Sequence, residues 1–177
     1  CVAKEFCAHT PFQLLIVPED PLRTKPKACN YALWQSRGDI VVIYDAEDRP
    51  CPDQIRQAAA HFAVLPETVV CLQASLNYYN RNDNWLTRIF AAEYACIFDI
   101  VLPGLQRLRA PLPLGGTSNF FRTEALISIG GWDPYNVTED ADIGIRLSAC
   151  GFESRVLPSM TLEEAPGDLK GWIFQRS

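Results

Sequence analysis

Several common functional signals are missing from this sequence. Its 177 residues include only two histidines, His9 and His61, which lie far apart and have no metal-ligand pattern around them. The seven cysteines form no CxxC pair and no zinc-binding spacing. Their odd number and apolar surroundings indicate reduced thiols of a cytosolic protein. These absences argue against a zinc site and against a secreted, disulfide-stapled scaffold.

Basic charge and long uncharged apolar runs are also scarce. Sixteen Lys and Arg against 21 Asp and Glu give a net charge of −5, which argues against nucleic acid as a partner. The most apolar long stretch, residues 89–105, contains Glu93 and Asp99, so it predicts a buried or interfacial helix. No signal peptide is recognisable. The length suits a single domain over residues 1–177. Because the chain begins at Cys1, we expect an excerpt of a longer protein.

Strands and helices are predicted to alternate along the chain. Short apolar runs bounded by turn residues predict strands at residues 12–17, 40–44, 68–72 and 152–157. Helical spacing predicts helices at residues 24–35, after Pro52, and at residues 83–101, 123–129 and 138–150. Pro103-Gly104 is expected to end the helix at 83–101. This alternation predicts an α/β sandwich with a mostly parallel sheet.

The acidic turn Asp45-Ala46-Glu47-Asp48 is the most informative feature of the chain. It follows the run at residues 40–44, which reads as a buried parallel strand. Open α/β sheets bind their ligands at the C-terminal ends of such strands. Clustered carboxylates repel one another unless a cation neutralises them, and oxygen ligands suit Mg²⁺ or Mn²⁺. A solvated acidic turn that caps the next helix explains the same residues, so both interpretations stay open.

Three further segments allow a functional and a purely structural interpretation. The cations of residues 23–27 oppose the helix dipole unless a phosphate binds there, and a solvated basic turn is the alternative. Residues 115–122, GGTSNFFR, offer backbone N–H groups and hydroxyls to a polar ligand, or form a turn into a strand. Thr138-Glu139-Asp140 makes a good helix cap. Alternatively, Asp140, kept ionised by the helix dipole, accepts a proton from a hydroxyl.

Together these segments resemble the processive, membrane-bound branch of family 2 glycosyltransferases, which includes cellulose, hyaluronan and exopolysaccharide synthases. The resemblance rests on RTKPKACNYAL, IVVIYDAEDRP, GGTSNFFR, GGWDPYNVTEDADIGIRLSACGF and GWIFQR, in this order. The ordered triple of DAED, TED and QR is its most specific part. It implies a GT-A fold, a nucleotide-sugar-binding α/β sandwich with a mostly parallel sheet. The family's first β-α-β unit has no counterpart, so the domain looks incomplete at both ends.

The resemblance also implies roles for individual residues. Asp45 and Glu47 match the DxD motif, which holds Mg²⁺ or Mn²⁺ and the diphosphate; the second acid is Glu, and Asp48 is an alternative ligand. Asp140 matches the aspartate of the TED motif, the general base. Further residues implied for donor binding are Lys27, Asn30, Gln175 and Arg176, and residues implied to shape the site are Gly116, Thr117, Thr138 and Glu139. The Q-x-x-R-W motif is cut after Arg176.

The implied activity is a metal-dependent, inverting transfer of a hexose from a UDP-sugar to a growing polysaccharide or glycan acceptor. Membrane segments would lie outside this chain, and the protein would work at the cytoplasmic face of the plasma (inner) membrane. A catalytically degenerate module that binds a nucleotide or glycan is the alternative. A Mg²⁺-dependent phosphatase would use Asp45 as a nucleophile but leaves TED and QR without a role.

Overall fold

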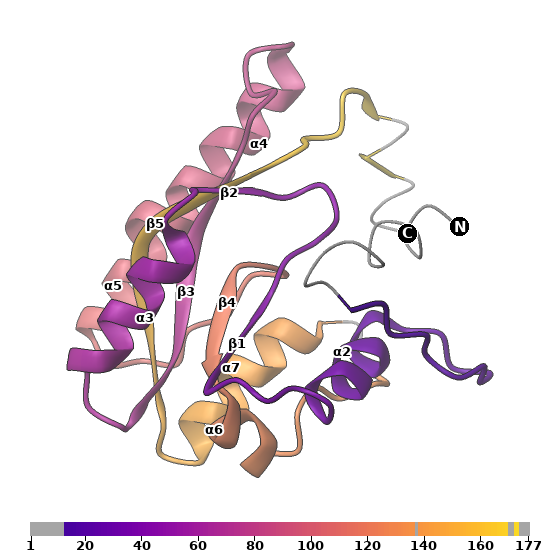
Figure 1. Ribbon diagram of the computed structural model, residues 1–177. Coiled ribbons are helices and arrows are strands. Elements are labelled where there is room, and N and C mark those ends of the chain that lie inside the picture. The colour runs from indigo at the N-terminus through magenta and orange to yellow at the C-terminus, as the bar shows by residue number, and fades with distance from the viewer. Residues whose placement is uncertain (1–12, 137, 170–171, 174–177) are drawn as a thin grey trace.

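The structure, a computed structural model, describes residues 13–136, 138–169 and 172–173, and a single mixed sheet forms its centre (Figure 1). The strands follow the spatial order β1-β4-β3-β5-β2. Their bounds are β1 (Ile40–Ile43), β2 (Arg49–Pro50), β3 (Val69–Tyr78), β4 (Asn119–Arg122) and β5 (Glu153–Glu163). The helices are α2 (Lys25–Leu33), α3 (Gln54–Val64), α4 (Trp85–Ala95), η1 (Cys96–Val101), α5 (Leu102–Arg107), α6 (Thr123–Ser128) and α7 (Glu139–Ala149).

The prediction of a mostly parallel sheet is wrong at the level of strand pairing. Only β3 and β5 pair in parallel within the described part of the chain, whereas the pairs β1–β4, β4–β3 and β5–β2 are antiparallel. After α5 the chain returns along residues 110–118, and β4 then runs antiparallel to both β1 and the first half of β3. The strand β1 is therefore an edge strand of intermediate burial among the described residues, and not the buried parallel strand that was expected.

The predicted helices lie close to the observed ones, but β3 and β5 extend to Tyr78 and Glu163, beyond the predicted ends at residues 72 and 157. Two further differences concern the first strand and the long helix. The strand expected at 12–17 is absent from its described part, residues 13–17, and Phe12 lies outside the described residues. The long helix does not end at Pro103-Gly104, because a π-helical turn precedes the proline. In that turn the Leu102 N–H donates to the Ile97 carbonyl, and Pro103 then falls in the first turn of α5, where a missing N–H is tolerated.

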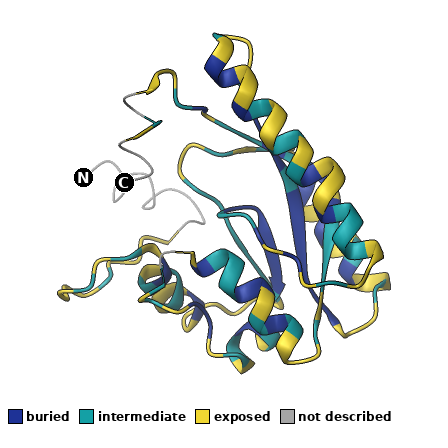
Figure 2. Ribbon diagram, turned by 180° about the vertical axis from the view of Figure 1, so that it is seen from behind, coloured by how far each residue is buried: buried dark blue, intermediate teal, exposed yellow. Residues whose placement is uncertain are grey.

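The continuous helix Trp85–Arg107 is more exposed than the sequence suggested. Its 23 residues have a mean hydropathy of 1.4 over their most apolar window, and only 17% of that window is buried. By length and composition alone the helix is long and apolar enough to cross a membrane, a test that core helices of soluble proteins also pass. Figure 2 shows that its outer face is exposed while its inner face lies against the sheet.

The core has three parts: two lie on opposite faces of the sheet, and the third, around Tyr78, Leu86 and Phe90, lies between β3 and α4. Phe121 of β4 lies in the larger part, with buried residues of α2, η1, α5, α6 and α7. Its neighbour Phe120 points to the other face, where it lies in a smaller cluster with Ala58 and Phe62 of α3. This alternation is the period-two pattern of a strand that is covered on both faces. The larger part anchors the two helices, α2 and α7, that border the candidate site.

Candidate active site

Lys25 of α2 and Asp45 form an ion pair at the end of β1. The Lys25 Nζ lies 2.7 Å from the Asp45 Oδ1, and the same ammonium group donates to the Gly116 carbonyl at 2.7 Å. Burial alone would lower the pKa of Lys25, but the hydrogen bond and charge of Asp45, together with the charge of Asp140, raise it. Lys25 thus remains a cation between the acidic turn and the loop that precedes β4.

Asp140 lies in the first turn of α7, close to this ion pair. A Cβ added to Gly116 would lie 3.4 Å from the Asp140 Oδ2, so the carboxyl group and the Gly116 backbone are neighbours. Burial, then the charge of Glu139 and to a lesser extent that of Asp45, raise the pKa of Asp140 to about 7, and Lys25 opposes the rise. Burial therefore acts against the expected effect of the helix dipole, which favours the ionised acid. The structure thus brings Asp45 and Asp140 together from distant parts of the sequence.

Asp48 and Thr117 fix the shape of the acidic turn. The Asp48 Oδ2 accepts a hydrogen bond from the Asp45 N–H at 2.7 Å and another from the Thr117 hydroxyl. Thr117 also donates to the Ile43 carbonyl at 3.3 Å, which ties the loop before β4 to the end of β1. The second oxygen of Asp48, Oδ1, is buried and has no hydrogen-bond partner within the described part of the chain.

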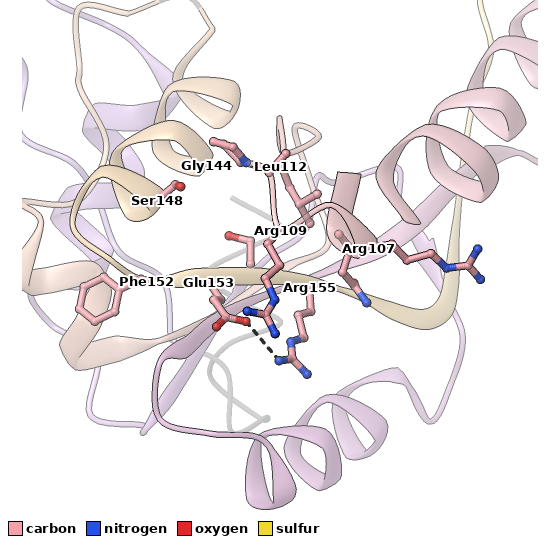
Figure 3. Close-up of a pocket in the computed structure, with 12 residues that line it drawn as sticks. Arg107, Arg109, Leu112, Gly144, Ser148, Phe152, Glu153 and Arg155 are labelled. Carbon is pink, nitrogen blue, oxygen red and sulfur yellow. Dashed lines mark hydrogen bonds and ion pairs between the residues drawn. The ribbon is translucent and has the colours of Figure 1, made fainter. Parts of the chain in front are cut away.

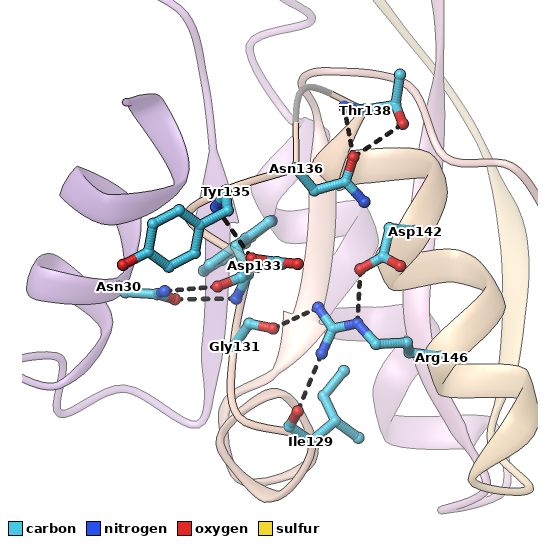
Figure 4. Close-up of polar contacts among 10 residues, drawn as sticks. Asn30, Ile129, Gly131, Asp133, Tyr135, Asn136, Thr138, Asp142 and Arg146 are labelled. Carbon is cyan, nitrogen blue, oxygen red and sulfur yellow. Dashed lines mark hydrogen bonds and ion pairs between the residues drawn. The ribbon is translucent and has the colours of Figure 1, made fainter. Parts of the chain in front are cut away.

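Lys27 and Asn30 do not join this cluster. Lys27 is paired with Asp20 at 2.8 Å and lines a separate hollow between α2 and the segment before it. Two positions along a helix are about 200° apart, so only one of Lys25 and Lys27 can face Asp45. The Asn30 side chain holds the backbone of Trp132 with two hydrogen bonds, at 2.7 and 2.9 Å (Figure 4). Its amide group is thereby committed to the loop before α7.

That loop is held from a second side by Arg146 of α7. Its guanidinium group donates to Asp142 at 2.7 Å, to the Ile129 carbonyl at 3.0 Å and to the Gly131 carbonyl at 2.7 Å (Figure 4). Gly131 has a φ of +69°, and a Cβ there would lie too close to the Asn30 Oδ1, so only glycine fits. These contacts set α2 against α7, and through them Lys25 against Asp140.

The remaining predicted residues are placed as follows. Thr138 precedes α7, but its hydroxyl donates to the Asn136 Oδ1 at 3.1 Å and does not cap the helix. Glu139 is buried in the first turn of α7, next to Asp140. Gln175 and Arg176 lie outside the described residues, so their implied roles stay predictions.

Comparison with known proteins identifies the family. A family model described as Glycosyl transferase family group 2 matches residues 40–177. The chain belongs to this family. The glycosyltransferase expected from the sequence is thus confirmed at the level of the family.

Relatives of this family 2 glycosyltransferase chain cover most of it but are much longer. A probable glycosyltransferase, YdaM of Bacillus subtilis (strain 168), is 26% identical over 99% of the chain and 42% of its own length. The beta-monoglucosyldiacylglycerol synthase of Synechocystis sp. (strain ATCC 27184 / PCC 6803 / Kazusa) is 32% identical over 79% of the chain and 29% of its own length. A probable glucomannan 4-beta-mannosyltransferase of Arabidopsis thaliana is 28% identical over 85% of the chain and 26% of its own length. The chain therefore spans less than half of each relative.

A solved structure confirms the fold class. The mannosyltransferase PcManGT from Pyrobaculum calidifontis, solved in complex with GDP-Man and Mn²⁺, superposes with a TM-score of 0.71 and 22% sequence identity. The match covers 99% of this chain and 46% of the PcManGT chain. The chain therefore has the expected GT-A fold, with a mixed and not a mostly parallel sheet.

The acidic turn fits a divalent metal that a ligand helps to hold. Among the residues that the structure describes, no three His, Cys, Asp or Glu side chains are grouped closely enough to hold a metal ion by themselves. Mg²⁺, however, is usually bound by one or two carboxylates and completed by water and substrate phosphates. Asp45 and Glu47 supply carboxylates, and the buried Asp48 Oδ1, without a partner in the described part of the chain, is a further carboxylate oxygen. This all-oxygen set suits Mg²⁺ or Mn²⁺.

Sequence reasoning missed two side chains in and beside this site. Lys25 belongs to the basic segment 23–27, but no local pattern distinguishes it from Lys27. Glu163 ends β5 beside the acidic turn, where burial first, and then the charges of Asp48, Asp45 and Glu47, raise its pKa to about 7. An acid at the end of an apolar strand was the available signal, the same one that singled out Asp45.

Glu163 and Glu47 border a hollow of about 280 Å³ beside the acidic turn. Its other walls include four aromatic side chains, Tyr78, Phe90, Tyr94 and Trp172. The Tyr94 hydroxyl donates to the Glu163 Oε2 at 3.4 Å. Asp45, at the start of the acidic turn, therefore lies near Lys25 and Asp140, whereas Glu47 lies in the wall of this hollow.

Proposed function

We propose that this chain forms the catalytic part of an inverting hexosyltransferase that moves a hexose from a UDP-sugar to a growing polysaccharide or glycan acceptor. The observation that carries this proposal is the grouping of Asp45, Lys25 and Asp140 at one edge of a GT-A sheet. A diphosphate needs cations, and an attacking hydroxyl needs a base. The cluster offers the residues for both within one site.

Asp140 is the general base in this proposal. Its carboxylate accepts the proton of the acceptor hydroxyl while the hydroxyl oxygen bonds to the anomeric carbon. The bond from that carbon to the diphosphate oxygen breaks, and UDP leaves with the electron pair, so the configuration inverts. A pKa of about 7 places the acid near the operating pH, where a base is most effective. Because Lys25 opposes the rise in the pKa of Asp140, it also keeps more of the acid ionised.

Asp45 and Glu47 are the residues that would hold Mg²⁺ or Mn²⁺. A bound divalent ion would neutralise the charge that builds up on the departing diphosphate. Asp48 and Thr117 position this turn: the Asp48 carboxylate accepts a hydrogen bond from the Asp45 N–H, and the Thr117 hydroxyl donates to the same carboxylate. The Lys25 ammonium group lies within reach of the same region and donates hydrogen bonds to anionic oxygens.

We also propose that the full-length protein belongs to the membrane-bound, processive branch of the family. It would work at the cytoplasmic face of the plasma (inner) membrane through segments outside this chain. The relative named as a probable glucomannan 4-beta-mannosyltransferase supports a polysaccharide product. The ordered TED and QR segments support the processive branch.

A catalytically degenerate binding module remains the second candidate, and two observations favour it. Lys25 already neutralises Asp45, and no three-residue metal cluster exists in the described ranges. Turnover separates the two candidates. We expect the full-length protein to release UDP from a UDP-sugar with Mn²⁺ or Mg²⁺ present. Saturable UDP binding without release from any UDP-sugar would support the binding module.

The matched variants Lys25→Gln and Lys27→Gln test the site itself. Each removes one positive charge from α2, but only Lys25 contacts Asp45 and Gly116. We expect Lys25→Gln to lower turnover by roughly 10- to 100-fold, the loss of one or two charge-assisted hydrogen bonds. Lys27→Gln should stay within about twofold, since its exposed pair is worth little. Equal losses in the two variants would contradict the placement of the site at Lys25.

A further inference from the structure

Another hollow, drawn in Figure 3, lies at the opposite end of β5 from the acidic turn. Its volume is about 350 Å³, which is within the range of small-molecule sites. Its walls come from α5, the loop after it, α7 and the start of β5. Glu153 in its wall and Glu163 at the acidic turn lie at the two ends of β5, roughly 30 Å apart at the rise of an extended strand. The hollow is thus separate from the proposed active site.

The charge of this hollow is opposite to that of the chain. Arg107, Arg109 and Arg155 line it, and among the described residues of its wall Glu153 is the only acidic one. Glu153 pairs with Arg155 at 3.1 Å, while Arg107 and Arg109 have no carboxylate partner among the described residues. In Figure 3 the Arg107 side chain extends away from Arg109 and Arg155, so the net positive charge directed to this concave site is that of Arg109, on a chain with a net charge of −5. Such a site concentrates anions.

Arg109 is held toward the hollow by an unusual backbone. The end of α5 forms a Schellman motif, in which the Arg109 N–H donates to the Gln106 carbonyl at 3.1 Å and the Ala110 N–H to the Leu105 carbonyl at 3.0 Å. Arg109 occupies the left-handed position of this motif, with a φ of +54°. Glycine is the usual residue there, since a side chain is disfavoured in the left-handed region. The arginine therefore stands at a position where local stability would favour glycine.

We propose that this hollow binds the phosphate group of a small phosphomonoester. The planar guanidinium groups of Arg109 and Arg155 match the geometry of phosphate oxygens, which they bind in pairs. The Ser148 hydroxyl, on α7, is a further hydrogen-bond donor in the wall, and the ring of Phe152 offers an apolar surface to the body of the ester. In Figure 3, Arg109 and Arg155 extend to the same side of the hollow as Glu153.

Calorimetric titration of the full-length protein with glycerol 3-phosphate tests this proposal, with inorganic phosphate and glycerol as comparison probes. We expect saturable binding of glycerol 3-phosphate, weaker binding of inorganic phosphate and none of glycerol. Arg155→Gln and Arg109→Gly should each weaken the binding by roughly tenfold, the effect of one charge-assisted contact. Glycine suits the left-handed backbone at position 109, so Arg109→Gly removes the charge without disturbing the helix end.

Two control variants make the result decisive. Arg88→Gln removes an exposed charge from α4, about 28 Å along the same helix at 1.5 Å per residue, and should leave the affinity unchanged. Lys25→Gln should also keep the binding, because it alters only the proposed active site. The proposal is overturned if glycerol 3-phosphate does not bind saturably. It is equally overturned if Lys25→Gln abolishes the binding while Arg109→Gly retains it, since the probe would then occupy the other site.

Discussion

Replacing Asp140 by Asn should make the folded protein more stable at alkaline pH. The pKa of this carboxyl group rises from the usual 3.8 to about 7, mainly because of its burial. An acid whose folded pKa is raised is ionised more readily in the unfolded chain, so the folded state loses stability as the pH rises from about 4 to about 7. A rise of this size in the pKa corresponds to a loss of at most about 4 kcal/mol. Because the group is partly exposed to solvent, we expect about 1–2 kcal/mol.

Urea unfolding of the full-length protein, without metal or nucleotide, measures this effect when wild type and Asp140→Asn are compared from pH 5 to pH 8. The stability advantage of the variant should grow with pH and level off above pH 7, because wild-type Asp140 is then ionised in both states. Asp99→Asn, at an exposed acid on η1, is a suitable control and should show no such trend. A pH-independent difference, or a less stable Asp140→Asn at pH 8, would refute the buried-carboxyl argument.

Two further predictions concern the packing around α7 and are measured by the same unfolding experiment. Gly144→Ala should lower the free energy of unfolding by about 1–3 kcal/mol or more, because its Cβ would clash with the Leu112 carbonyl oxygen. Gly104→Ala has no atom within 4 Å of its Cβ and should instead raise the free energy of unfolding by about 0.5–1 kcal/mol. Asn30→Ala should cost about 1–3 kcal/mol, because it removes both hydrogen bonds to the Trp132 backbone. Equal effects at the two glycines, or a neutral Asn30→Ala, would contradict these contacts.

The sequence located most elements but not the direction of the strands. Apolar runs and capping residues are local signals, and they placed α3, α6 and α7 to within a few residues. Strand direction depends on how a loop returns to the sheet, which the pattern of residues 119–122 does not contain. The helix end at Pro103 was misjudged for a similar reason. A π-helical turn accommodates the proline, and nothing in the local composition signals such a turn.

The candidate site was partly predictable, because some of its residues carry local sequence signals and others do not. Strand-end acids and a helix cap pointed to Asp45 and Asp140, and their resemblance to known motifs connected them. The choice between Lys25 and Lys27 depends on the rotation of α2, which Asn30 and the Trp132 loop set through tertiary contacts. Such contacts are not visible in a single sequence.

The most direct test of the central claim is the turnover of Asp140→Asn in the full-length protein. UDP release from a UDP-sugar with Mn²⁺ or Mg²⁺ is measured together with UDP affinity. We expect turnover to fall by about 10²–10⁴-fold, the contribution of a positioned general base, while UDP affinity stays nearly unchanged. Asp45→Asn should instead weaken metal-dependent UDP binding as well as turnover. Wild-type turnover in Asp140→Asn would contradict the assignment of Asp140 as the base.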